Sequence, residues 1–303
     1  MKRNVTRWCE LSAILIAFAC RADNRSAADS SASLPPVYPS APANPNWDSA
    51  AGPLMIVSAG LSDTVGVVIP EATDSTIESL QTATPPVAGL LFDLFGRGGR
   101  IASSVTLSPI SQMDSSQECY SWPMARVQTK RGNWRVGFVS RHVQPIPLDS
   151  IEAMPSADSA ALAVSLTRTV ATLPAASDPV FRGLPFRVRS AYAFRLDSVT
   201  VVVADVVRSV NEEANPRVEH LLIFGERPRS SSGKFDVAYY SRTAGAEEAT
   251  QATEILAVVM IGAAKRPAAV VNVEYDDGGK LGLVERVSSG EWRATWRSAY
   301  TDC

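Results

Sequence analysis

The stretch FRVRSAYAFRLDSVTVVVADVVRSV, residues 186–210, decides the fold of this 303-residue chain. Its first part alternates large apolar side chains with arginine or alanine, and a period of two is typical of a strand with one buried face. From Val199 onward the stretch is rich in valine and apolar on both faces, which indicates a central strand. We therefore predict two strands here and expect Phe186, Val188 and Phe194 to face the interior.

Six similar apolar runs follow, separated by turn residues such as Asp276–Gly279 and Ser288–Gly290. Short connections between strands favour antiparallel neighbours. Residues 181–303 are therefore expected to form an antiparallel meander of about eight strands, either a closed barrel or an open, strongly coiled sheet. Trp292 and Trp296 are expected on its inner face. The further strands are predicted at Val218–Glu226, Phe235–Ser241, Ile255–Ile261, Ala268–Tyr275, Leu281–Val287 and Trp292–Tyr300.

A helical spacing of apolar side chains predicts one amphipathic helix within residues 151–180. Ser156 is suited to cap its start, and Pro174 ends it. Before the helix, residues 51–150 hold five or six short apolar runs between turn signals, which predict a smaller antiparallel β domain. The fold class is thus mainly β, with one helix connecting two β parts. The apolar positions of the helix are Leu162, Leu166, Val170 and Leu173.

The first nineteen residues have the three zones of a secretory signal peptide. Lys2, Arg3 and Arg7 form a basic region, and residues 11–19, LSAILIAFA, form a short apolar run. Nine residues rise only ~14 Å as a helix, which is too little for a hydrocarbon core of ~30 Å. Residues 1–19 are therefore interpreted as an export signal that is removed from the mature chain.

The apolar run ends on Ala17-Phe18-Ala19 followed by Cys20, which resembles the lipobox of bacterial lipoproteins. The resemblance implies that Cys20 is acylated, becomes the first residue of the mature chain and anchors it to a membrane. Arg21 stands where an aspartate would imply retention at the inner membrane, so the resemblance favours the outer membrane in an organism that has one. The alternative is an ordinary cleavage site to which Cys20 is incidental.

Residues 20–50 are rich in Ser, Ala and Pro and carry too little apolar surface to offset the entropy of ordering them. We interpret them as a lipid-anchored disordered tether. The whole chain has a formal charge of −2, and loss of the signal removes three basic side chains and one acidic one, which leaves −4. A mildly acidic body offers no electrostatic case for binding nucleic acid.

The chain has four cysteines, of which Cys9 leaves with the signal and Cys20 is assigned to the lipid. Cys119 and Cys303 remain, and two thiols in an oxidising compartment indicate a disulfide. The bond would tie the last residue of the chain to the first half of the body. If Cys20 is not acylated, three thiols compete and the pairing stays open.

No catalytic, metal or cofactor motif is found, so a non-enzymatic protein without a cofactor is expected. His220 alternates with Val218 and Leu222, which favours a hydrogen-bonded core histidine. Ser231–Lys234 matches Ser-x-x-Lys but lies between predicted strands, whereas the catalytic version needs a helical turn. The glycines of Gly96–Arg100 lead into a strand, whereas a dinucleotide fingerprint opens a helix.

Arginines recur on one side of two predicted strands. If the sheet closes, these strands are the first and the last and therefore adjacent, which would form a patch able to bind anionic lipid, polysaccharide or an acidic partner. The simpler alternative is a solvated face whose arginines pair with Glu219, Glu274 or Glu285. The arginines are Arg187, Arg189 and Arg195 on the first strand, and Arg293 and Arg297 on the last.

Together these features favour a lipid-anchored, extracytoplasmic binding or accessory protein of the bacterial cell envelope. It would lie on the periplasmic side of its membrane and bind a protein partner, in one version as a subunit of a membrane complex. An alternative is a β-barrel carrier that holds a small apolar ligand inside eight closed strands. The third is a carboxylate-dependent hydrolase. Glycoside hydrolysis needs two carboxylates at a defined separation on rigid strands, whereas the acid pairs Glu212-Glu213 and Glu247-Glu248 are predicted in loops.

Overall fold

The fold was obtained as a computed structural model. It describes residues 48–58, 63–72, 77, 81, 84–110, 122–128, 132–174, 178–211, 215–231, 233–275 and 278–302. The chain divides into two units, residues 1–37 and 38–303, and every described residue belongs to the second unit. That unit is mainly β, with antiparallel sheets and an amphipathic helix between its two β parts, which confirms the predicted fold class.

The N-terminal part is a closed six-stranded barrel in the order β1-β2-β5-β4-β3-β6. The sequence predicts a hairpin between Leu90–Phe95 and Arg100–Leu107, which is confirmed, because β3 and β4 pair through the turn at Gly96–Gly99. A second hairpin, predicted between Ala125–Thr129 and Trp134–Ser140, is wrong, since β5 pairs with β2 and β4, and β6 with β1 and β3. The strands are β1 (Met55–Ser58), β2 (Thr64–Val67), β3 (Leu91–Gly96), β4 (Gly99–Pro109), β5 (Met124–Val127) and β6 (Val136–Val139), and the 3-10 helix η1 (Ser49–Ala51) precedes them.

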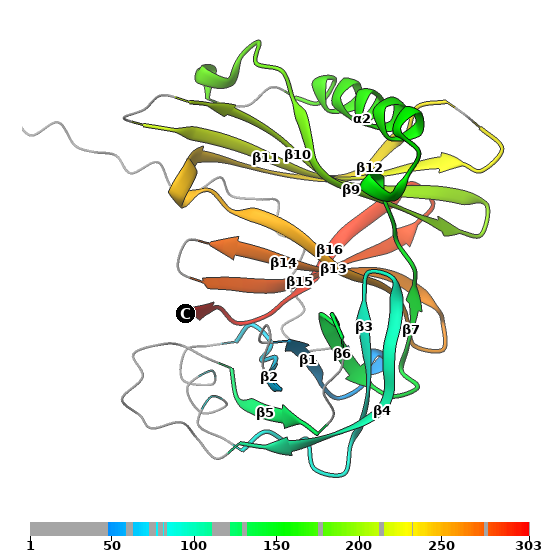
Figure 1. Ribbon diagram of the computed structural model, residues 1–303, viewed down its shortest axis with the longest axis vertical. Coiled ribbons are helices and arrows are strands. Elements are labelled where there is room, and N and C mark those ends of the chain that lie inside the picture. The colour runs from blue at the N-terminus through cyan, green and yellow to red at the C-terminus, as the bar shows by residue number, and fades with distance from the viewer. Residues whose placement is uncertain are drawn as a thin grey trace, which may run out of the picture. The chain divides into compact units, whose positions relative to one another are not determined.

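All eight strands predicted after residue 181 are present, but four of them lie in a five-stranded sheet and the other four in a six-stranded sheet (Figure 1). Strands β9–β12 form one meander and β13–β16 the other. The meander breaks at the 3-10 helix η4 (Glu247–Ala249), because β12 and β13 do not pair. The strands are β9 (Arg187–Leu196), β10 (Val199–Val210), β11 (Arg217–Pro228), β12 (Asp236–Ala246), β13 (Ala252–Ile261), β14 (Arg266–Tyr275), β15 (Gly278–Ser288) and β16 (Glu291–Arg297).

Two short strands of the predicted N-terminal domain belong to the C-terminal sheets. β7 (Val143–Ile146) pairs with β13, and β8 (Asp149–Ser150) pairs with β9. The barrel therefore ends at Val139, earlier than the expected boundary at residue 150. The remaining elements are the 3-10 helices η2 (Ile151–Ala153) and η3 (Pro179–Phe181), the helix α2 (Ser156–Ala171), and β17 (Thr301–Asp302), which pairs with β15.

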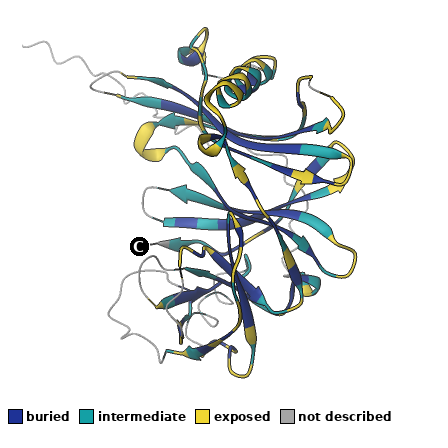
Figure 2. Cartoon of the chain, turned by 45° about the vertical axis from the view of Figure 1, so that its right-hand side comes forward, coloured by how far each residue is buried: buried dark blue, intermediate teal, exposed yellow. Residues whose placement is uncertain are grey.

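This unit has four apolar cores, three between its layers and one inside the barrel, and Figure 2 shows the buried residues gathered in its strands. The helix core lies between α2 and the β8–β12 sheet, and the sandwich core fills the space between the two sheets with Phe194, Phe224 and Trp292 among its members. An interface core that includes Trp296 and Phe138 joins the second sheet to the outside of the barrel. The barrel has its own core. The eight strands therefore pack as a filled sandwich and do not close into the barrel that was one expectation.

A β-bulge divides the faces of β9. Its register against β10 shifts by one residue at Ser190. Beyond the bulge, Phe194 lies in the sandwich core, whereas Phe186 and Val188, before it, pack against the helix core. The expectation that all three share one interior face is therefore wrong, because an extra residue in a strand turns the side chains that precede it to the opposite face.

Candidate functional site

The α2 helix covers only part of the sheet beneath it. Leu166 and Val170 are its buried residues, and Leu162 and Leu173 pack at the margin of the helix core, as the helical spacing predicted. The helix begins one residue earlier than expected, since Pro155 occupies the N-cap position and Ser156, the predicted cap, is the first helical residue. A helix is about 10 Å wide, so one helix leaves parts of a five-stranded face open on both flanks.

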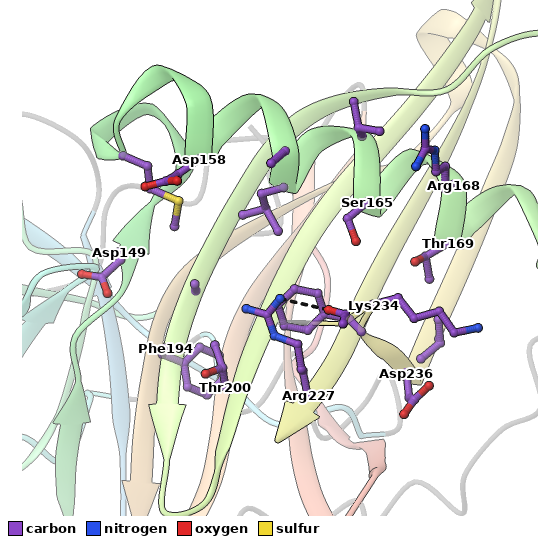
Figure 3. A pocket seen from close by; sticks show the side chains of 18 of the residues that line it. Asp149, Asp158, Ser165, Arg168, Thr169, Phe194, Thr200, Arg227, Lys234 and Asp236 are labelled. Atoms are coloured by element: carbon purple, nitrogen blue, oxygen red, sulfur yellow. Dashed lines mark hydrogen bonds between the residues drawn. The ribbon is translucent and has the colours of Figure 1, made fainter. Parts of the chain in front are cut away.

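One flank is an open cavity of ≈ 1070 Å³, which we call the α2 groove. One wall is formed by α2 and the residues that follow it, from Asp158 to Leu173 (Figure 3). The other walls come from the β9–β10 hairpin, with Arg195 and Thr200, and from residues of β11, β12 and their connection, among them Arg227 and Val237. The walls mix apolar side chains such as Leu162 with charged ones. Sites of this size and composition hold small ligands or peptide segments.

Charge is unevenly distributed along the α2 groove. Asp149 and Asp158 lie toward one end (Figure 3). Arg227 and Lys234 lie toward the other, where one carboxylate, that of Asp236, lies as well. The Arg227 guanidinium stacks 4.3 Å from the Phe235 ring centroid and donates a 3.0 Å hydrogen bond to the Gly233 carbonyl. Its Nε is buried and meets no acceptor among the described residues. This arrangement suits an occupant with a basic group at one end and an acidic group at the other.

Two buried carboxylates occupy opposite faces of the β8–β12 sheet. Asp205 accepts from His220 Nδ1 at 3.1 Å and from Arg189 at 3.0 Å, so the predicted hydrogen-bonded core histidine is confirmed. On the helix side, Glu219 is fully buried and pairs with both Arg208 and Arg242. The sequence signal for both clusters is a charged residue inside an otherwise apolar central strand, because such a residue is buried only with a partner.

A third buried carboxylate joins the two sheets. Glu226 of β11 accepts a bidentate pair from Arg286 at 2.7 and 2.8 Å, and it also accepts from Trp292 Nε1 at 2.7 Å and from the Gly290 amide at 3.0 Å. Burial raises the pKa of Glu226, but these hydrogen bonds outweigh burial and hold its pKa below the ordinary value of 4.5. The cluster fastens one end of the sandwich.

The predicted arginine patch does not assemble. β9 and β16 belong to different sheets, so their arginines are not brought together by strand pairing. Arg189 pairs with Asp205 and Arg293 with Glu291, while Arg195 lines the α2 groove. The patch was predicted to consist of Arg187, Arg189, Arg195, Arg293 and Arg297.

The cysteines of the sequence predictions, Cys20, Cys119 and Cys303, lie outside the described residues. The chain segments next to the last two nevertheless converge. The Pro123 carbonyl accepts from the Val67 amide at 2.8 Å, and the Ala299 amide donates to the Ile69 carbonyl at 2.8 Å. Trp122 and Ala299 also share the interface core. The proposed disulfide is thus compatible with the positions of its described neighbours.

The described residues contain no group of three or more His, Cys, Asp or Glu side chains arranged for a metal ion. Within the same part of the chain, no helix combines the length and the apolar character needed to cross a membrane. Of the paired acids considered for hydrolysis, Glu212-Glu213 lie outside the described residues, and Glu247-Glu248 lie exposed in η4. Comparison of the chain with protein-family models, curated proteins and solved structures finds no match.

Proposed function

We propose that this chain is a lipid-anchored, extracytoplasmic binding or accessory protein of the bacterial cell envelope. Its anchor is Cys20, its tether is residues 20–50, and its binding site is the α2 groove. The observation that carries the binding role is the groove itself, an open cavity whose walls mix apolar and charged side chains, with two carboxylates toward one end and an excess of basic groups toward the other. Preorganised polar groups at the ends of an apolar cleft fix the orientation of an occupant.

The occupant that fits best is a segment of a partner protein in the same envelope. The charges of the groove are complementary to a segment with a lysine or arginine near Asp149 and Asp158 and an acidic residue near Arg227 and Lys234. An apolar side chain between them would lie against Leu162. Complementary charges at the two ends would fix the direction of the bound segment.

The anchor is tested by replacing Cys20 with Ser. The acyl chains are expected to hold the mature protein on the membrane, so the C20S variant should move from the membrane fraction to the soluble or secreted fraction. Fractionation of cells that express either form measures the shift. Equal retention of both forms on the membrane would remove Cys20 as the anchor.

The groove is tested with two substitutions on neighbouring exposed alanines of α2. Ala161 lines the groove and Ala160 does not. Arginine is a good helix former, so A161R and A160R should both fold. A partner co-purified from detergent-solubilised membranes should be lost with A161R and kept with A160R. Equal recovery of that partner with both variants would place its binding site elsewhere.

A further inference from the structure

The second flank of α2 carries a smaller cavity of ≈ 520 Å³, which we call the arginine pocket. It lies beside the last turns of the helix and above the ends of β10 and β12. Its charged lining is entirely basic among the described residues, and its apolar lining comes from Val170, Leu184 and Phe186. The four basic residues are Arg168, Arg182, Arg208 and Arg242.

Arg208 is held in a fixed orientation at the base of this pocket. Its side chain is only 9% exposed, its Nε donates to Glu219, and its guanidinium lies 4.4 Å from the Phe186 ring centroid and 5.7 Å from that of Phe181. Its terminal amino groups have no described acceptor. A guanidinium that is oriented by a carboxylate behind it and by rings beside it presents its remaining donors at low entropic cost.

The same cluster holds two guanidinium groups around one carboxylate. Glu219 accepts from both Arg208 and Arg242, and Arg242 also donates to the Pro174 carbonyl at 2.6 Å. These contacts fix the positions of both side chains beside the pocket. Arg168 and Arg182 add two exposed cations at the rim, and no described carboxylate pairs with either.

We propose that the arginine pocket binds the phosphate group of a small ligand whose apolar part lies against Val170, Leu184 and Phe186. A phosphate monoester carries about −1.5 to −2 charge at neutral pH, so four arginine side chains attract it more strongly than they attract a single carboxylate. Arginine forks also match the paired oxygens of phosphate. Both a free organic phosphate and a phospholipid head group carry this chemistry. The proposal is independent of the anchor. Arg168 lines both cavities, whereas Arg182, Arg208 and Arg242 line only the arginine pocket of the two.

Calorimetric titration of the purified full-length chain tests the proposal with two probes. Phenyl phosphate represents a soluble monoester, and dihexanoyl phosphatidic acid, kept below its micellar concentration, represents a lipid head group. Saturable binding of either probe supports the proposal, and the probe that binds more tightly identifies the source. Benzoate is expected to bind at least tenfold more weakly than phenyl phosphate. Equal binding of benzoate, or saturable binding of neither phosphate probe, would overturn the assignment.

Substitutions locate the bound probe. Arg182 and Arg168 are exposed, so R182Q and R168Q should fold, and each should weaken binding about tenfold through the loss of one charge-assisted contact. The matched control is R195Q, an exposed arginine in the α2 groove, which should leave the affinity unchanged. R208K keeps the charge but loses the fork, and it should weaken binding while the circular dichroism spectrum stays native. If R182Q and R168Q bind as the wild type does, or if R195Q weakens binding as much as they do, the phosphate does not lie in this pocket.

Discussion

The two sheets of the C-terminal sandwich have the same construction but different surroundings. Each contains a four-stranded meander and a short edge strand, β8 on the first and β7 on the second, and β17 also pairs with β15. The outer face of the second sheet is covered by the barrel through a broad apolar core. The outer face of the first is covered by α2, with η2 and η3 packed on the same sheet, and both described cavities flank α2. The difference supports our proposal that the first sheet presents the binding surface.

The largest expected effect is that of the Cys119–Cys303 disulfide, which would fasten the barrel to the end of the second sheet. Closing so long a loop stabilises the folded state by up to about 5 kcal/mol in the chain-entropy model. Mass spectrometry of the non-reduced, digested mature protein should recover the two cysteine peptides joined. Urea unfolding with and without reductant would then measure the stabilisation. Free thiols at both positions would mean that packing alone joins these parts.

Next in size is the loss of a buried side chain from the interface core. Phe138 is fully buried there, beside Phe95 at a ring-centroid distance of 6.1 Å. F138A should lower the free energy of unfolding by about 3–5 kcal/mol. L162A, at the margin of the α2 groove, should lower it by only about 1 kcal/mol, because Leu162 is already partly exposed. Equal losses in urea unfolding would contradict the contrast between the two outer faces.

A smaller loss is expected when the charge under α2 is removed. E219Q leaves Arg208 and Arg242 without their shared carboxylate and should lower stability by roughly 3 kcal/mol. The control E291Q removes an exposed partner of Arg293 and should cause no measurable change. Thermal or urea unfolding compares the two. A fully stable E219Q protein would show that the buried cluster is not needed to hold α2 in place.

The smallest effect concerns pH. The folded pKa of Glu226 lies below its unfolded value of about 4.5, so its carboxylate stabilises the folded state above that pH, and the stabilisation is lost as pH falls through the lowered pKa. E226Q should be less stable than the wild type near neutral pH, by roughly 1–2 kcal/mol. The difference should narrow as the pH falls below 4.5. Urea unfolding across this range measures it, and a pH-independent difference would contradict the assignment.

Local pattern predicted the elements well, because strands and helices leave a periodic signal in the sequence. The eight C-terminal strands and the apolar positions of α2 follow directly from periods of two and 3.6. Local pattern did not predict which strands pair with one another or where their register shifts. The bulge at Ser190 and the break between β12 and β13 depend on which strands meet, and the turn before Ala252 resembles an ordinary hairpin connection.

The binding surfaces were missed for the same reason. The arginines on β9 and β16 were expected to lie side by side because the sheet was expected to close. The structure instead gathers arginines from α2, the loop after η3, β10 and β12 around one pocket. Asp205 and Arg208 interrupt the valines of β10, and this interruption is a signal in the sequence from which buried partners could have been predicted.

Site-specific photo-crosslinking in living cells tests the central claim most directly. Val164 on the α2 groove and Val287 on β15 are exposed to nearly the same extent, 46% and 47%. A photoreactive residue at position 164 should crosslink one envelope protein reproducibly, the same residue at position 287 should not, and adding A161R should abolish the product. Crosslinking of that protein equally well from both positions, or its persistence with A161R, would contradict the assignment of the binding surface to the first sheet.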